Sequence, residues 1–258
     1  MESNVANPDG REVSGVDANY RPQTPWTAPR ALLATLAILV AGGVAGVGAF
    51  KLVARLAGLE SAPADRGFEA IVWLGMTQVV MVVLTYVASR QFGGQPQRVL
   101  ALGPPAGGWR DYAIAMGQLI VGLAAFNALM YFVFKVDLMT DLKPFLEIIR
   151  HPGWLVALLV IGIGAPVSEE LLFRGFLQSA LSRSRIGFWP GAGIATGMWT
   201  ALHIGYSLVG LAEVALIGML FSWVLWRSGS TRVTVVCHAV YNTALALLMR
   251  FYLAYKLV

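Results

Sequence analysis

The feature that most restricts this sequence is a series of long, uncharged apolar runs, the first of which covers residues 32–50. A run of roughly 18 or more such residues is long enough to cross a hydrocarbon layer of ~30 Å as an α-helix. Of the 258 residues, 57% are hydrophobic and only 13% are charged, which is more apolar surface than a soluble core of this size can enclose. A soluble enzyme is therefore excluded, and the sequence predicts an all-α, polytopic helical membrane protein.

The sequence contains seven candidate spans. In the first, Gly42 and Gly46 have the small-xxx-small spacing that lets two helices approach closely. An eighth span would have to lie in residues 136–150, where five charged residues favour a short helix in the membrane interface instead. We expect seven to eight spans in one membrane domain over residues 30–258, preceded by a disordered polar tail over residues 1–29. The seven predicted spans are 32–50, 71–88, 112–134, 154–181, 188–206, 209–226 and 233–249.

The charged residues predict orientation rather than a binding surface. The net charge of +5 comes from 19 basic and 14 acidic residues. The bases lie between the apolar runs rather than in one patch, so the lipid bilayer is an expected partner and nucleic acid is not. Their distribution favours a cytoplasmic N-terminus. The excess of 15 Arg over 4 Lys, together with short loops, suits a bacterial inner membrane. The sequence sets no oligomeric state.

Three ionisable residues, Glu169, Glu170 and Arg174, lie in the fourth predicted span. A charged side chain at the centre of a membrane costs about 2–3 kcal/mol or more unless it is paired or solvated, so such residues mark functional sites. Residues four apart share a helical face, and Glu170 is therefore expected to form an ion pair with Arg174. Glu169 lies about 100° away around the helix and is left without this cation, which suits it to act as a general base. Pro166 is expected to start a turn or kink the helix and admit water.

Later spans contribute three more polar side chains. His203 is the one histidine of the fifth predicted span, which holds no acidic or basic residue, and it follows Trp199 by four residues. In the seventh, His238 and Asn242 are also four apart, which places an imidazole and a carboxamide on one helical face. Such a pair can bind a water molecule and stabilise an oxyanion.

Three other residues are assigned packing or interfacial roles. His151 lies at the boundary of a span and has no polar companion nearby in the sequence. Glu213, near the start of a span, has none at helical spacing and is expected to reach toward the headgroups. Cys237 is next to His238 and so faces another direction on a helix, which disfavours a Cys-His dyad.

Together, Glu169, His203, His238 and Asn242 supply a base, hydrogen-bond donors and an oxyanion contact, the groups needed to activate water against an amide carbonyl. The residues therefore predict peptide hydrolysis within the membrane. Glu169 and the two histidines are also a set that can ligate zinc and activate a metal-bound water. The helical signature with two histidines four residues apart around a glutamate is absent. Metal-dependent and metal-free hydrolysis both stay open on the residues alone.

Three motifs in this part of the chain resemble those of a known family. Residues 165–175, Ala-Pro-Val-Ser-Glu-Glu-Leu-Leu-Phe-Arg-Gly, resemble the Glu-Glu-x-x-x-Arg motif of the CAAX protease and bacteriocin-processing (CPBP, or Abi) family. Residues 199–203 resemble its aromatic-x-x-x-His motif, with Trp where Phe is common, and residues 238–242 resemble its His-x-x-x-Asn motif. The resembling core covers about residues 150–250.

The resemblance implies an intramembrane endopeptidase of the type II CAAX prenyl protease kind. It implies that Glu169 activates water, that His203 and His238 assist, and that Asn242 contributes to the oxyanion hole. Glu170 and Arg174 would be supporting residues. We favour the glutamate-type, cofactor-free form over the zinc form. The implied partner is a membrane-associated peptide or protein, either a prenylated CAAX-type substrate or one with a leader peptide.

Two other classes of protein are consistent with a polar cluster in a membrane. A non-catalytic bacteriocin-immunity or scaffold protein would use the cluster to bind a partner, but the intact motif residues disfavour it. A proton-coupled transporter would use Glu169, Glu170 and His203 as a relay. The absence of an internal sequence repeat disfavours the transporter.

Overall fold

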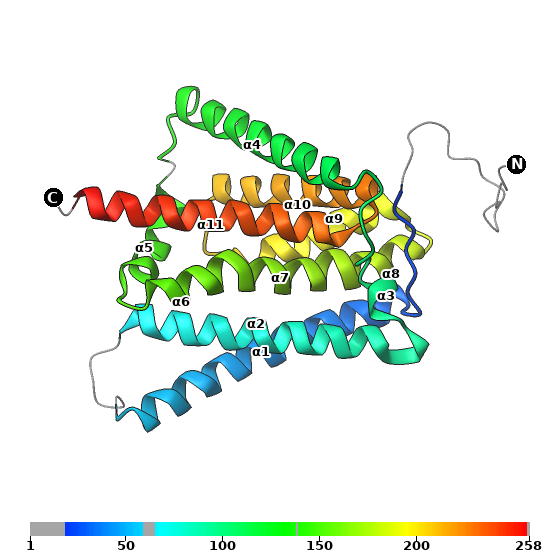
Figure 1. Cartoon of the computed structure of the whole chain (residues 1–258), viewed down its shortest axis with the longest axis horizontal. Coiled ribbons are helices and arrows are strands. Elements are labelled where there is room, and N and C mark those ends of the chain that lie inside the picture. Colours follow the sequence, from blue (N-terminus) through cyan, green and yellow to red (C-terminus); the bar gives the residue numbers. More distant parts are fainter. Residues whose placement is uncertain (1–18, 59–64, 138, 257–258) are drawn as a thin grey trace, which may run out of the picture.

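The computed structural model describes residues 19–58, 65–137 and 139–256, and all regular structure in these ranges is helical. The long helices run roughly along the longest direction of the molecule (Figure 1). Six of them are long and apolar enough to cross a membrane, which confirms the all-α, multi-pass class. These six are α1 (Ala28–Leu56), α2 (Arg66–Arg90), α4 (Trp109–Phe132), the continuous helix Trp154–Arg183, α10 (Leu208–Ser228) and α11 (Thr231–Lys256).

The fifth predicted span, 188–206, is shorter than expected. Its helix α9 (Phe188–Ala201) has 14 residues, which is about 21 Å at 1.5 Å per residue and less than the thickness of a membrane core. After Ala201 the chain turns, with Tyr206 N–H bonded to the carbonyl of His203 at 2.8 Å. Ser207 then caps the start of α10 by accepting a bond from Gly210 N–H at 3.1 Å. Among the described residues, six helices are long enough to span a membrane and α9 is not one of them, so the expected count of seven to eight spans is not confirmed.

Residues 136–150 do not form an eighth span. They contain α5 (Lys143–Arg150), whose eight residues extend for only about 12 Å. Ile148 and Ile149 are buried on one side of α5, which contacts α2 and α11. Short connecting elements complete the described chain: η1 (Gln91–Gly93), α3 (Pro96–Val99) and η2 (Thr140–Leu142).

The polar segment expected to be a disordered tail is packed where the structure describes it. Residues 1–18 lie outside the described residues. From residue 19 onward, the backbone N–H of Tyr20 donates to the carbonyl of Trp226 at 3.2 Å, and the Tyr20 hydroxyl lies 2.7 Å from Ser179 Oγ. Thr24 is buried, and its carbonyl accepts a bond from Arg183. Hydrogen bonds to Ser179, Arg183 and Trp226 thus order residues of a segment that is too polar to show apolar periodicity.

The helix Trp154–Arg183 lies between α2 and α11, as Figure 1 shows. On one side of it, α1 packs against α2, where Gly42 and Gly46 bring the two helices close together as their spacing predicts. On the other side, α4 lies over α10 and α11. The motif-bearing segment of the chain is thereby enclosed by helices on both flanks.

The helix Trp154–Arg183 contains two π-helical segments between its α-helical parts. It consists of α6 (Trp154–Leu159), a π-helical turn η3 (Val160–Gly164), α7 (Ala165–Glu169), a second π-helical segment η4 (Glu170–Leu177) and α8 (Gln178–Arg183).

Pro166 accounts for the first of these π-helical turns and for a free carbonyl within it. The N–H of Ala165 bonds to the carbonyl of Val160, five residues earlier. The next carbonyl in this register, that of Ile161, faces Pro166, which has no N–H to donate. The helix does not break at Pro166, but it leaves the carbonyl of Ile161 for a donor from outside the helix.

Candidate active site

Glu170 is the buried centre of the site. Its Oε1 lies 3.2 Å from Arg174 Nη1 on the same helix and 3.1 Å from His238 Nδ1 on α11. The side chains of Glu170 and Arg174 are fully buried. The ion pair predicted from their spacing is therefore confirmed. Because Glu170 also holds His238, it joins the first and third sequence motifs.

Glu169 lies next to Glu170 but in a different environment. It is the last residue of α7 and is half-buried. Its Oε2 accepts a hydrogen bond of 2.6 Å from the indole Nε1 of Trp199. Adjacent residues point about 100° apart on a helix, so Arg174 and His238 contact Glu170 instead. One acid is thus buried and charge-paired, and its neighbour is partly accessible and held by a neutral donor.

His203 lies in the turn that follows α9, rather than in the middle of a helical span as expected. Its Nδ1 is 3.1 Å from the carbonyl of Trp199. Its ring makes edge-on contacts with Trp199 at 5.3 Å and with Tyr206 at 5.2 Å between centroids. The turn places this imidazole beside the same indole that binds Glu169.

Asn242 and His238 face the same neighbouring helix, as their spacing predicts. Asn242 Nδ2 donates to the carbonyl of Ile161, the one left free by proline, at 3.1 Å. The adjacent Thr243 hydroxyl lies 3.4 Å from the carbonyl of Gly162. A carboxamide nitrogen carries two hydrogens, so Asn242 has a second N–H to offer to another acceptor.

Trp199 lies at the centre of the candidate site, although reasoning from charge and spacing did not single it out. Its ring is 2% exposed, and the guanidinium carbon of Arg174 lies 4.3 Å from its centroid. The His238 ring is 5.6 Å away. Trp199 therefore contacts residues of all three motifs. The signal for it in the sequence is the indole at a motif position where a phenyl ring is common.

The residues proposed as zinc ligands have other partners. In the part of the chain that the structure describes, no group of three or more His, Cys, Asp or Glu side chains is placed to hold a metal ion. Of the set considered, His238 is directed at Glu170, and Glu169 accepts the Trp199 N–H. This arrangement does not fit a preformed zinc centre.

Two of the residues assigned peripheral roles have partners distant in the sequence. Glu213 Oε1 accepts a bond of 2.9 Å from Asn127 Nδ2 on α4, so this half-buried acid does not extend to the headgroups as expected. His151 Nε2 lies 3.3 Å from Asp65 Oδ2. Asn127 lies on α4 and Asp65 caps the start of α2, so spacing along one helix does not reveal either partner.

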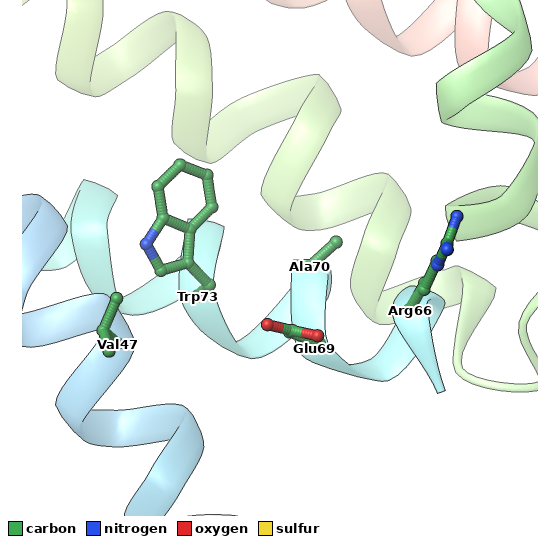
Figure 2. A pocket seen from close by; sticks show the side chains of 5 residues that line it. All are labelled: Val47, Arg66, Glu69, Ala70 and Trp73. Atoms are coloured by element: carbon green, nitrogen blue, oxygen red, sulfur yellow. The ribbon is translucent and has the colours of Figure 1, made fainter. Parts of the chain in front are cut away.

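Two surface hollows occur near the start of α2, away from the motif residues. One lies toward the end of α5. The other lies between α1 and α2, where the side chain of Glu69 sits between those of Arg66 and Trp73 (Figure 2). Neither hollow includes a residue of the candidate active site. The residues lining the second are Val47, Arg66, Glu69, Ala70 and Trp73.

Fold and site together define a multi-pass membrane protein with a carboxylate and histidine centre enclosed by its helices. Residues 151–244 match the family model described as Type II CAAX prenyl endopeptidase Rce1-like. It begins at His151 and ends within α11, so it contains all three motifs.

One relative in Escherichia coli, described as an uncharacterized 24.3 kDa protein, is 38% identical over 89 residues. The match covers 34% of this chain and 41% of that protein. It therefore spans less than half of the length of either. No solved structure matches the chain.

Proposed function

We propose that this protein is an intramembrane endopeptidase that hydrolyses a peptide bond of a membrane-associated substrate. The observation that carries the proposal is the contrast between the adjacent acids: Glu170 is paired with Arg174, and half-buried Glu169 is bound to a neutral donor. A carboxylate without a paired cation can accept a proton. The match of residues 151–244 to a family of endopeptidases supports the same function.

In the proposed reaction, Glu169 takes a proton from a water molecule as the water oxygen adds to the scissile carbonyl carbon. The second N–H of Asn242 stabilises the negative oxygen of the tetrahedral intermediate. The C–N bond then breaks, and Glu169 returns the proton to the leaving amine. This reaction needs no metal.

The two histidines assist in this proposal. The contact of His238 Nδ1 with Glu170 fixes its ring and leaves Nε2 for the substrate or water. His203 lies against the edge of the Trp199 ring, in a turn that is partly exposed. Glu170 and Arg174 act as supports that hold His238 and the motif helix in place.

The proposed substrate is a membrane-associated peptide or protein, either prenylated at a CAAX-type end or carrying a leader peptide. The proposed location is the bacterial inner membrane with the N-terminus in the cytoplasm, on the basis of the Arg-rich loops and their charge distribution.

The test is cleavage of a quenched fluorescent, farnesylated CAAX peptide by protein purified in detergent. Wild type is compared with Glu169→Gln, and each is assayed with and without a zinc chelator. We expect Glu169→Gln to lower kcat/KM by about 10²–10⁴-fold, because proton transfer by a positioned group contributes about this much. The chelator should have no effect.

Glu69→Gln is the matched control, since it makes the same change at an exposed glutamate outside the site (Figure 2). Equal rates for wild type and Glu169→Gln would reject Glu169 as the base. Inhibition by the chelator would reject the metal-free form. Cleavage of an unprenylated, membrane-anchored leader peptide in place of the prenylated one would reassign the substrate class.

A further inference from the structure

The indole of Trp199 makes two kinds of contact that a phenyl ring cannot combine. Its Nε1 donates to Glu169 Oε2 at 2.6 Å, and its face lies against the Arg174 guanidinium at 4.3 Å. Tryptophan combines a large π-face, which attracts cations, with a ring N–H that only donates. Trp199 thus binds the carboxylate of Glu169 and also contacts Arg174, the cation that pairs with Glu170.

The neighbouring helix α10 leaves room for this stack at Gly218. A Cβ atom there would lie 3.1 Å from Arg174 Nη2 and 3.1 Å from Trp199 Cε3. It would also lie 2.6 Å from Thr196 Cγ2, a separation that real Cβ atoms do not adopt. The absence of a side chain at this one position lets the guanidinium and the indole pack face to face in a buried space.

The contact to Glu169 constrains the carboxylate without neutralising it. Arg174 supplies a positive charge to Glu170, whereas the indole N–H is a neutral donor to Glu169. The indole binds one carboxylate oxygen, Oε2, and in the proposed reaction the other oxygen takes the proton from water. A general base must lie within hydrogen-bond reach of the proton it removes, so an unrestrained Glu169 side chain would spend less time in a productive orientation.

We propose that Trp199 is a positioning residue that holds the Glu169 carboxylate in its reactive orientation. The inference rests on the proposed function of Glu169 as the base. It assigns to the tryptophan of the second motif a role that phenylalanine cannot fill at that position, because the phenyl ring has no donor.

Trp199→Phe tests the role in catalysis, since it removes the N–H and keeps an aromatic face for Arg174. With the farnesylated peptide as substrate, kcat should fall by about ten- to a hundredfold, as expected for a misplaced catalytic group, and KM should change little. The control is Trp189→Phe on the same helix, where the ring is 44% exposed; it should leave both constants unchanged. An unaltered kcat in Trp199→Phe, or a rise in KM alone, would overturn the proposal.

A double-mutant cycle in thermal unfolding tests the contact without depending on activity. Trp199→Phe should lower Tm in the wild type and lower it less when Glu169 is replaced by alanine, because the acceptor is then missing. If Trp199→Phe does not fold, Trp199→Tyr provides the second variant, with an aromatic face but no donor at the indole position.

The two measurements separate the possible failures. Strictly additive Tm changes would overturn the positioning contact itself. If the Tm changes are coupled but the wild-type protein cleaves neither the prenylated nor the leader peptide, the contact is upheld and the proposed hydrolysis is rejected. Coupled changes with a reduced kcat in Trp199→Phe would support both.

Discussion

Two helix contacts in this protein are built on glycine but serve different ends. In the α1–α2 pair, a Cβ at Gly46 would lie 2.6 Å from the carbonyl of Trp73, and the nearby Thr77 hydroxyl donates to the carbonyl of Gly42 at 3.2 Å. Where α11 meets the helix Trp154–Arg183, a Cβ at Gly162 would likewise clash with the side chain of Thr243. Only the second contact is accompanied by a buried ion pair and a histidine.

Helix packing and chemistry require different kinds of residue. Small residues and backbone acceptors are enough to hold two helices together in lipid. Buried charges add cost and are kept where they have a function. The α1–α2 pair lies outside the family-matched segment 151–244, and the charged contact lies within it. We therefore expect changes in the first region to affect stability alone and changes in the second to affect both stability and activity.

Arg174→Ala should have the largest effect on stability. Removing the partner of a fully buried Glu170 leaves an uncompensated charge, at a cost of about 3–5 kcal/mol. The yield of folded protein in detergent and its Tm should both fall sharply. Arg90→Ala, at the exposed end of α2, is the matched control and should change Tm little. Normal unfolding of Arg174→Ala would contradict the importance of the ion pair.

Gly46→Ala should have an intermediate effect, confined to the α1–α2 pair. The added methyl group would meet the carbonyl of Trp73 and force the helices apart, and overpacking of this kind costs about 1–3 kcal/mol. Gly48→Ala is the control on the same helix, because its Cβ would have nothing within 4 Å. It should stabilise the helix by about 0.5–1 kcal/mol instead. Tm should fall for the first variant only, and a change in kcat of the folded Gly46→Ala protein would contradict the separation of the two regions.

Tyr20→Phe should have the smallest effect. It removes the hydroxyl that lies 2.7 Å from Ser179 Oγ, and an intramolecular hydrogen bond contributes about 1 kcal/mol. The serine keeps its bond to the carbonyl of Val99 at 2.9 Å, so no buried group is left without a partner. Thermal unfolding should show a small decrease in Tm relative to the control Tyr255→Phe, where the ring is 85% exposed. Equal Tm values for the two variants would mean that the residue 19–27 segment adds no stability through this bond.

The sequence predicts those parts of the fold that depend on local patterns. Hydropathy finds the long helices because each must cover its own length of membrane. It misjudges residues 188–206, where the composition stays apolar after α9 has ended at Ala201. It also misses the packing of Tyr20 and Thr24, because polar residues ordered by hydrogen bonds to distant helices have no periodic pattern.

The same division applies to the candidate site. The pairing of Glu170 with Arg174 follows from spacing along one helix. The contacts of Glu170 with His238 and of Glu169 with Trp199 join residues 68 and 30 positions apart. Such contacts depend on how helices are arranged around each other, which a single sequence does not encode in any local spacing. The roles of Glu169, His203, His238 and Asn242 in hydrolysis stay predictions.

Pro166 has a consequence for how α11 is set in the bilayer. Because the ring lacks an amide hydrogen, the carbonyl of Ile161 is available, and Asn242 binds it. A shift of α11 by one residue along its axis would move the carboxamide out of reach and leave that oxygen unsatisfied in lipid. The missing amide hydrogen of Pro166 therefore ties the axial position of α11 to the helix Trp154–Arg183. The same position sets the level at which His238 meets Glu170.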